Sequence, residues 1–218
     1  MLQVARYLLK SFNRIQRGSK KPLGDSVSYL KSESFTLDTD DQNELRNSDN
    51  LIKAYINNSC QKVKKAGEKL LQGITGGQEL KKTWDELAGI DLVEASTAHS
   101  YYWMVKNFYV DVTKIEDRNT RKALGRVFLL YAIEKIIDYS TSFFETNSIT
   151  AKTFIGLRKL RETLYSEIRP DALCLVEAFG YTDHTLMSAI GSSDGKPYEN
   201  LLDWARNSND VNKPEVRA

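Results

Sequence analysis

The sequence has few cysteines and no long apolar run, and its net charge is close to zero. Two cysteines in 218 residues exclude a disulfide framework and favour a reducing intracellular compartment. No stretch approaches the roughly 18 consecutive apolar residues that a membrane-spanning helix requires. Thirty-one basic and 29 acidic side chains leave a net charge of +2. This charge is too small to favour nucleic-acid binding over the whole surface.

Proline is also scarce, and none occurs between Pro22 and Pro170. Because proline breaks helices, its absence over this length favours helical structure. No segment alternates apolar and polar residues for long enough to predict a sheet. We therefore expect an all-α fold, in which long helices joined by short turns form an up-and-down bundle.

Apolar residues repeat at steps of three and four along several segments, which predicts amphipathic helices. We expect the first helix over residues 1–17, a polar connector with one short helical turn over 18–47, and a helical bundle domain over 48–218. Within the bundle, helices are expected over 48–75, 78–87, 91–115, 119–139, 150–168, 170–179, 183–190 and 198–207.

The helix ends follow from residues that cap or break helices. Ser48, Asp91 and Thr150 suit N-caps, and Gly89 suits the end of the helical piece before it. The helix at 119–139 is apolar over so much of its circumference that we expect it to be the central, most buried one. Its apolar residues include Leu124, Val127, Phe128, Tyr131, Ile136 and Tyr139.

Few side chains have the spacing of a catalytic or metal-binding motif. His99 has apolar neighbours, so we interpret it as a hydrogen-bonded core histidine rather than a catalytic base, and we expect His184 at the surface or at a helix start. Cys60 and Cys174 lie among apolar helix-forming residues and are expected in the core. Neither histidine has metal-ligand spacing, and the sequence has no glycine-rich phosphate loop. These residues predict a helical domain without a self-contained active site.

A basic segment runs from Lys62 to Lys82, with six lysines and two glutamates. We interpret it as a solvated helix face; the alternative is contact with an acidic partner or with the phosphates of a nucleotide or coenzyme. Acidic residues of the connector are candidates to lie against this segment: Glu33, Asp38, Asp40, Asp41 and Glu44.

Three segments resemble the C-terminal region of peroxisomal acyl-CoA oxidases in their order and spacing. They are residues 171–179 (DALCLVEAF), 194–205 (DGKPYENLLDWA) and 212–216 (NKPEV). Residues 84–98 resemble the segment before that family's long helices, and residues 2–10 resemble the helix after its catalytic segment. The chain is therefore similar, over nearly its whole length, to the C-terminal helical domain of this family.

The resemblance implies an activity for a longer parent enzyme. In that family FAD oxidises the α,β bond of a fatty acyl-CoA to the trans-2-enoyl-CoA, and oxygen reoxidises the flavin to give hydrogen peroxide. The family's proton-abstracting glutamate lies in a Glu-Gly-(Asp/Glu)-Asn-Thr segment just before the helix that begins here at Met1. This sequence has no such segment, so no catalytic residue, FAD contact or acyl-CoA contact is assigned, and no tightly bound cofactor or metal is expected.

The resemblance also implies a place and a role. Fatty-acid β-oxidation in the peroxisome is the expected context, and support of a homodimer is the expected role of this domain. The last residues, Val216-Arg217-Ala218, do not match a Ser-Lys-Leu address, and we expect that both ends are cut from a larger chain. Asp194 and Gly195 match the family, and we expect them to form a turn and helix cap rather than a ligand contact.

Two hypotheses remain open from the sequence. The first is the C-terminal domain of an acyl-CoA oxidase with a structural role, and the alternative is a non-enzymatic interaction module that kept the oxidase fold. In either case the apolar stripe of the first helix needs a partner, since exposed apolar area is unfavourable by about 25 cal/mol per Å². We expect this helix to pair with a second copy, with Leu8 and Leu9 in the contact.

Overall fold

The computed structural model describes residues 2–18 and 22–207. Two compact units divide the chain, Met1–Arg169 and Pro170–Ala218. The expected domain boundaries after residues 17 and 47 therefore lie inside one unit. The expected bundle domain over 48–218 is instead divided after Arg169. Within the described ranges every regular element is helical, and the only strand-like pairing is an isolated bridge between Leu37 and Ile149. The all-α prediction is confirmed.

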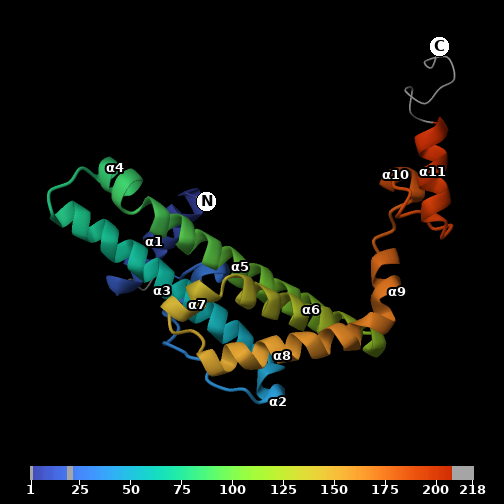
Figure 1. Ribbon diagram of the computed structural model, residues 1–218. Coiled ribbons are helices and arrows are strands. Elements are labelled where there is room, and N and C mark those ends of the chain that lie inside the picture. The colour runs from blue at the N-terminus through green and yellow to red at the C-terminus, as the bar shows by residue number, and fades with distance from the viewer. Residues whose placement is uncertain (1, 19–21, 208–218) are drawn as a thin grey trace, which may run out of the picture. The chain divides into compact units, whose positions relative to one another are not determined.

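Four long helices form the frame of the first unit (Figure 1). They are α3 (Ser48–Thr75), α5 (Gly89–Thr113), α6 (Arg118–Asp138) and α8 (Ala151–Ile168). Helix α3 packs against α5, α5 against α6, and α6 against α8, and successive long helices reverse direction, as in an up-and-down bundle. None of the described helices is long and apolar enough to cross a lipid bilayer.

Polar N-cap residues precede α3, α6 and α8, where each side chain accepts a hydrogen bond from a backbone N–H of the first turn. The Thr150 side chain accepts a hydrogen bond from the Thr153 backbone N–H, which confirms this N-cap. Asn47, one residue before the expected Ser48, caps α3 by accepting from the Asp49 N–H. Gly89 was expected to end a helix, but it begins α5, because the preceding turn passes directly into that helix.

The segment between α3 and α5 is short and irregular. It contains α4 (Leu80–Lys82) and a π-helical turn, η2 (Thr83–Leu87), in place of one helix over 78–87. The Gly73 backbone lies so close to Thr83 that an added Cβ would come within 2.3 Å of the Thr83 Cγ2. This close approach lets the segment fold back tightly onto the end of α3.

Helix α1 (Leu2–Gln16) packs against α3 and α5 of its own unit. Leu8 is fully buried and Leu9 is 5% exposed, and an added Cβ at Gly67 of α3 would lie 3.4 Å from Leu9. The expectation that this stripe pairs with a second copy is therefore wrong. The connector is long enough for α1 to bury its apolar face within the chain.

The connector is packed rather than loose. It contains η1 (Asp25–Lys31), where a short turn was expected, and α2 (Gln42–Leu45), which the pattern did not predict. The Thr153 hydroxyl donates to the Leu37 carbonyl at 2.7 Å, and the Thr39 N–H donates to the same hydroxyl at 3.0 Å. These bonds fasten the connector to the start of α8.

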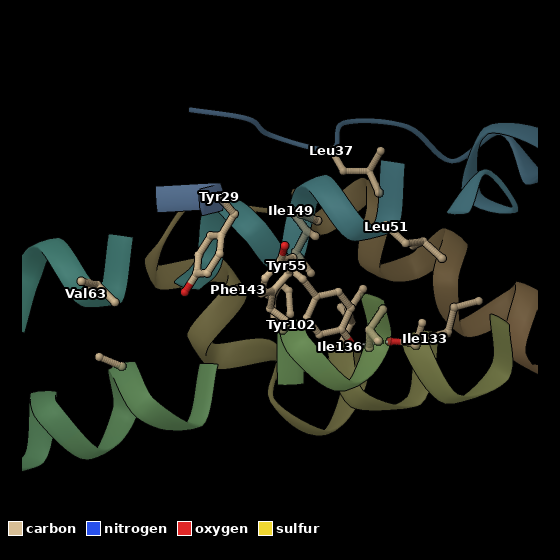
Figure 2. Close-up of a cluster of buried hydrophobic side chains, with 14 of the residues drawn as sticks. Tyr29, Leu37, Leu51, Tyr55, Val63, Tyr102, Ile133, Ile136, Phe143 and Ile149 are labelled. Atoms are coloured by element: carbon tan, nitrogen blue, oxygen red, sulfur yellow. Dashed lines mark hydrogen bonds between the residues drawn. The ribbon is translucent and has the colours of Figure 1, made fainter. Parts of the chain in front are cut away.

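The core lies between α3, α5, α6 and the connector (Figure 2). Figure 2 shows Tyr55 of α3 among Phe143, Tyr102 and Ile136, and the Tyr55 hydroxyl donates to the Ala132 carbonyl at 2.6 Å. The expectation that the helix at 119–139 is the most buried one is wrong. Most of α6 is half-buried, and its fully buried residues are Phe128, Ala132, Ile133 and Ile136. Helix α3 contributes more fully buried positions, which are Leu51, Ala54, Tyr55, Asn57, Asn58, Ser59, Lys62, Val63, Ala66 and Gly73.

The second unit consists of short helices. They are η3 (Arg169–Asp171), α9 (Ala172–Glu177), α10 (Asp183–Leu186) and α11 (Pro197–Asn207). Cys174 of α9 is exposed, so its expected place in the core is wrong. The reason is that α9 has six residues and none of them is buried. Helix α7 (Ser140–Glu145) of the first unit completes the described elements.

Candidate functional site

The most unusual side chain of the first unit is a buried lysine. Lys62 lies on α3 on the same face as Tyr55, Ser59 and Ala66, and its side chain is only 4% exposed. Its Nζ donates to Glu94 of α5 at 2.8 Å and to Glu145 of α7 at 2.6 Å. The lysine therefore links three helices through charge-assisted hydrogen bonds.

The two carboxylates keep Lys62 charged. Burial alone would lower the pKa of Lys62, but the hydrogen bonds that it donates to Glu145 and Glu94 raise the pKa above its usual 10.5. The same contact lowers the pKa of Glu145 below its usual range. At neutral pH Lys62 and Glu145 are therefore ionised, so Lys62 is a fixed cation and not a general base.

A cavity of about 360 Å³ lies beside this ion pair, lined in part by Lys62, Glu94, Asp138 and Glu145. Asp138 is paired with Lys135 at 2.8 Å, and Lys62 faces two glutamates, so one negative charge of the wall is uncompensated. FAD, which the resemblance implies for a parent enzyme, carries a negatively charged pyrophosphate that such a wall repels. The residues of this cavity do not fit FAD.

A second ion-pair group lies further along the same pair of helices. Asp91 of α5 is buried and accepts from Lys69 at 2.6 Å, and its other oxygen lies 3.1 Å from the Lys65 Nζ. Burial raises the pKa of Asp91, but the two lysines lower it further, so the net shift is downward. Asp91 was expected as an N-cap; instead it holds α5 against α3.

The basic segment is thus only partly a solvated face. Lys62, Lys65 and Lys69 share one side of α3 and face carboxylates of α5 and α7, while Lys64 is exposed. Three of the connector acids expected here, Asp38, Asp40 and Asp41, have other partners. Asp40, for example, lies 3.3 Å from the Lys152 Nζ.

A buried polar cluster joins the connector to α3 and α5. The Tyr29 hydroxyl of η1 lies 2.6 Å from the Ser59 hydroxyl and 2.9 Å from His99 Nδ1, at hydrogen-bond distance from both. Burial lowers the pKa of His99 and raises the pKa of Tyr29, so both are neutral. His99 is confirmed as a hydrogen-bonded core histidine.

Asn57 makes a similar link to the loop before α8. Its Nδ2 donates to the Thr146 carbonyl at 3.1 Å and to the Ser148 hydroxyl at 2.9 Å, and its Oδ1 accepts from the Phe35 N–H. The side chain is therefore fully used inside the fold. These contacts give Asn57 a structural role.

The remaining candidate residues lie apart from these groups. His184 is exposed in α10, as expected, and Cys60 is half-buried on α3, where burial raises the pKa of its thiol to about 12. Asp194 accepts from the Lys196 N–H at 3.0 Å beside Gly195, whose φ is +70°, so these two residues form the expected turn. Among the described residues no cluster of His, Cys, Asp or Glu could hold a metal ion.

Sequence reasoning missed Glu94 and Glu145 as partners of Lys62. The position of Lys62 on the apolar face of α3 could have indicated them. A lysine buried at such a position needs carboxylates on the facing helices. The resulting site holds helices together.

Comparisons with known proteins show which family has a similar sequence. The sequence model of a family described as acyl-CoA oxidase matches residues 47–218. The chain is 34% identical over 223 residues to peroxisomal acyl-coenzyme A oxidase 1 of Mus musculus and 32% identical over 211 residues to acyl-coenzyme A oxidase acox-1.2 of Caenorhabditis elegans. These alignments cover 99% and 95% of this chain, but only 33% and 30% of the relatives. The chain thus spans about one third of the length of the curated relatives it matches.

Solved structures give the same picture. Acyl-CoA oxidase-1 of Caenorhabditis elegans, in complex with FAD and ATP, matches with a TM-score of 0.87 at 28% identity, over 99% of this chain and 33% of that one. The tomato acyl-CoA oxidase LeACX1 matches with a TM-score of 0.87 at 27% identity, over 99% of this chain and 32% of that one. The helical fold described above is therefore similar to one third of each of these enzymes.

Proposed function

Because this chain belongs to the acyl-CoA oxidase family, we propose that it is the C-terminal helical domain of a FAD-dependent acyl-CoA oxidase. The parent would oxidise fatty acyl-CoA to trans-2-enoyl-CoA with formation of hydrogen peroxide. Its place would be peroxisomal fatty-acid β-oxidation, since relatives such as the mouse protein are named as peroxisomal oxidases. The supporting observation is that solved oxidases contain this fold as about one third of their chain.

Within that parent the domain has a structural role. Its ionised side chains at Lys62 and Asp91 are used to join helices, and the cavity beside Lys62 repels the anionic part of FAD. We expect the domain to support a homodimer. Helix α1 does not supply that contact with Leu8 and Leu9, because both side chains are buried in their own unit.

The isolated chain should bind no flavin tightly and should have no oxidase activity. The sequence lacks the Glu-Gly-(Asp/Glu)-Asn-Thr segment that carries the proton-abstracting glutamate in this family. Purified protein should therefore show no flavin absorption and release no peroxide from an acyl-CoA. Either signal would contradict the structural role.

The gene upstream of Met1 separates this proposal from the alternative. An in-frame Glu-Gly-(Asp/Glu)-Asn-Thr segment supports the oxidase domain, and the complete reading frame should then release peroxide from acyl-CoA and form a dimer in light scattering. A start codon at Met1 with no such segment upstream favours an interaction module. The observation that favours this alternative is the apolar surface of the second unit, where Leu173, Phe179 and Tyr198 are all exposed.

A further inference from the structure

The cavity beside Lys62 lies at the junction of α6 and α7. Tyr139 separates these two helices, and its φ of −109° and ψ of 26° are not helical, so the helices are not continuous. Helix α7 packs against α3 as well as α6. Residues of α3, α5 and α7 line the resulting space of about 360 Å³. This volume is in the range of cavities that hold small organic ligands.

Two tyrosines form an aromatic wall of this cavity. The ring centroids of Tyr101 of α5 and Tyr139 lie 4.6 Å apart, and the Tyr101 hydroxyl donates to the Tyr139 hydroxyl at 2.5 Å. Val93, Ala98 and Phe143 add apolar surface. A cation within about 6 Å of the centroid of an aromatic ring is attracted to the face of that ring. The wall can therefore receive both the apolar part and the charge of an organic cation.

Carboxylates give the cavity its charge. The Oε2 atoms of Glu94 and Glu145 accept from Lys62, and Asp138 is paired with Lys135 at 2.8 Å. Two lysines against three carboxylates leave a net charge of −1. Glu94 and Glu145 are both about half-exposed, so their second oxygens remain accessible from the cavity. One monovalent cation that receives these oxygens as acceptors would neutralise the group.

We propose that this cavity binds a small organic cation, a primary ammonium compound with an apolar or aromatic part. Its ammonium group donates to the second oxygens of Glu94 and Glu145, and its apolar part lies against Tyr101 and Tyr139. A bare metal ion would leave the aromatic wall and most of the volume unused. All lining residues belong to the first unit, so the chain can bind this ligand whether or not it is part of an oxidase.

Binding of three probes to the full chain tests this site by isothermal titration calorimetry. Phenethylamine carries both the ammonium group and the apolar part, phenethyl alcohol lacks the charge, and methylammonium lacks the ring. We expect phenethylamine to bind with a dissociation constant below about 1 mM, which rises with salt concentration. The other two probes should bind at least about tenfold more weakly, since each lacks one of the two contacts.

A change of charge with a matched control locates the ammonium group. Glu94→Gln keeps an oxygen that can accept from Lys62 but removes the net negative charge, so it should weaken phenethylamine binding about tenfold. Glu68→Gln removes the same charge from an exposed residue of α3 that does not line the cavity, and it should bind phenethylamine as the unchanged chain does.

A change of ring tests the aromatic wall separately. Tyr139→Leu keeps an apolar side chain but removes the ring, so it should weaken phenethylamine binding about fivefold. Tyr139→Phe restores the ring without the hydroxyl and should recover most of this loss. Circular dichroism of each variant verifies that the helices are retained, so that a loss of affinity reports on the cavity.

The proposal is overturned if phenethylamine does not bind at millimolar concentration, or if phenethyl alcohol or methylammonium binds as tightly. Unchanged phenethylamine affinity in Glu94→Gln or in Tyr139→Leu would also overturn it. None of these results bears on the oxidase proposal, which depends on peroxide release by the complete reading frame.

Discussion

Replacing Lys62 with methionine removes the cation that joins α3 to α5 and α7 while keeping most of the side-chain volume. The chain loses charge-assisted hydrogen bonds of 2.8 and 2.6 Å, each of a kind that contributes about 1.5–3 kcal/mol when fully buried. Glu94 and Glu145 are 41% and 51% exposed, so water can replace the lost partner. Burial of the ammonium group, which opposes folding, also disappears. We expect a net loss of about 1–2 kcal/mol in the free energy of unfolding.

The matched control is Lys64→Met, two residues further along the same helix. Lys64 is 54% exposed and lies 4.0 Å from Glu68, so its replacement should change stability by less than about 0.5 kcal/mol. Urea unfolding at neutral pH, followed by circular dichroism, measures both variants. Equal stabilities of Lys62→Met and Lys64→Met would refute the view that Lys62 links the helices.

The pH dependence gives an independent check on the same ion pair. The pKa of Glu145 is lowered on folding, so its contribution is present above its usual value of 4.5 and is lost as pH falls through the folded pKa. The pKa of Lys62 is raised, so its contribution is present below 10.5 and is lost as pH rises through the folded pKa. The stability difference between the unchanged chain and Lys62→Met should therefore be constant from about pH 6 to 9 and shrink on both sides. A difference that does not depend on pH would mean that lost packing is its cause.

Other regions of the first unit and the two cysteines give further tests. Phe128→Ala should lower the free energy of unfolding by about 3–5 kcal/mol, because the ring is 1% exposed; urea melts that show a loss below about 1 kcal/mol would place it outside the core. In the folded chain Cys174 should react with a thiol reagent at neutral pH, whereas Cys60, with its pKa raised to about 12, should react only on unfolding. Leu8→Glu should destabilise the chain by about 3 kcal/mol or more, because it buries a charge beside α3 and α5, and thermal melts measure this loss. Light scattering that instead shows conversion of a dimer to a stable monomer would return α1 to an interface between copies.

Local patterns in the sequence were sufficient to predict α1 and the four long helices, but not α2 or the irregular segment between α3 and α5. The absence of proline between Pro22 and Pro170 and the cap at Thr150 depend on neighbouring residues only, and the structure confirms what both implied. Burial depends on which helices pack together, which local patterns do not contain. Helix α6 is apolar over much of its circumference, but most of its apolar residues are half-buried against the core, and few, such as Phe128 and Ile133, are fully buried. In the same way, the sequence pattern predicted the apolar stripe of α1, but it did not predict that the helices of the same unit cover this stripe.

Long-range pairing also explains why the site was missed. Glu94 and Glu145 lie 32 and 83 residues beyond Lys62 in the sequence, and no local motif connects them. Sequence spacing cannot reveal such sites unless the register between helices is known.

The charged residues of α3 and α5 nevertheless indicate the register between the two helices. Lys62, Lys65 and Lys69 recur at steps of three and four, so they share one face of α3. On the antiparallel α5, Glu94 faces Lys62, and Asp91, one turn earlier in α5, faces Lys65 and Lys69. A shift of α5 by one turn would separate Glu94 from Lys62, so that the buried lysine would keep only Glu145 of α7 as its partner. The loss of this charge-assisted hydrogen bond is unfavourable, so the ion pairs favour the observed alignment of the two helices.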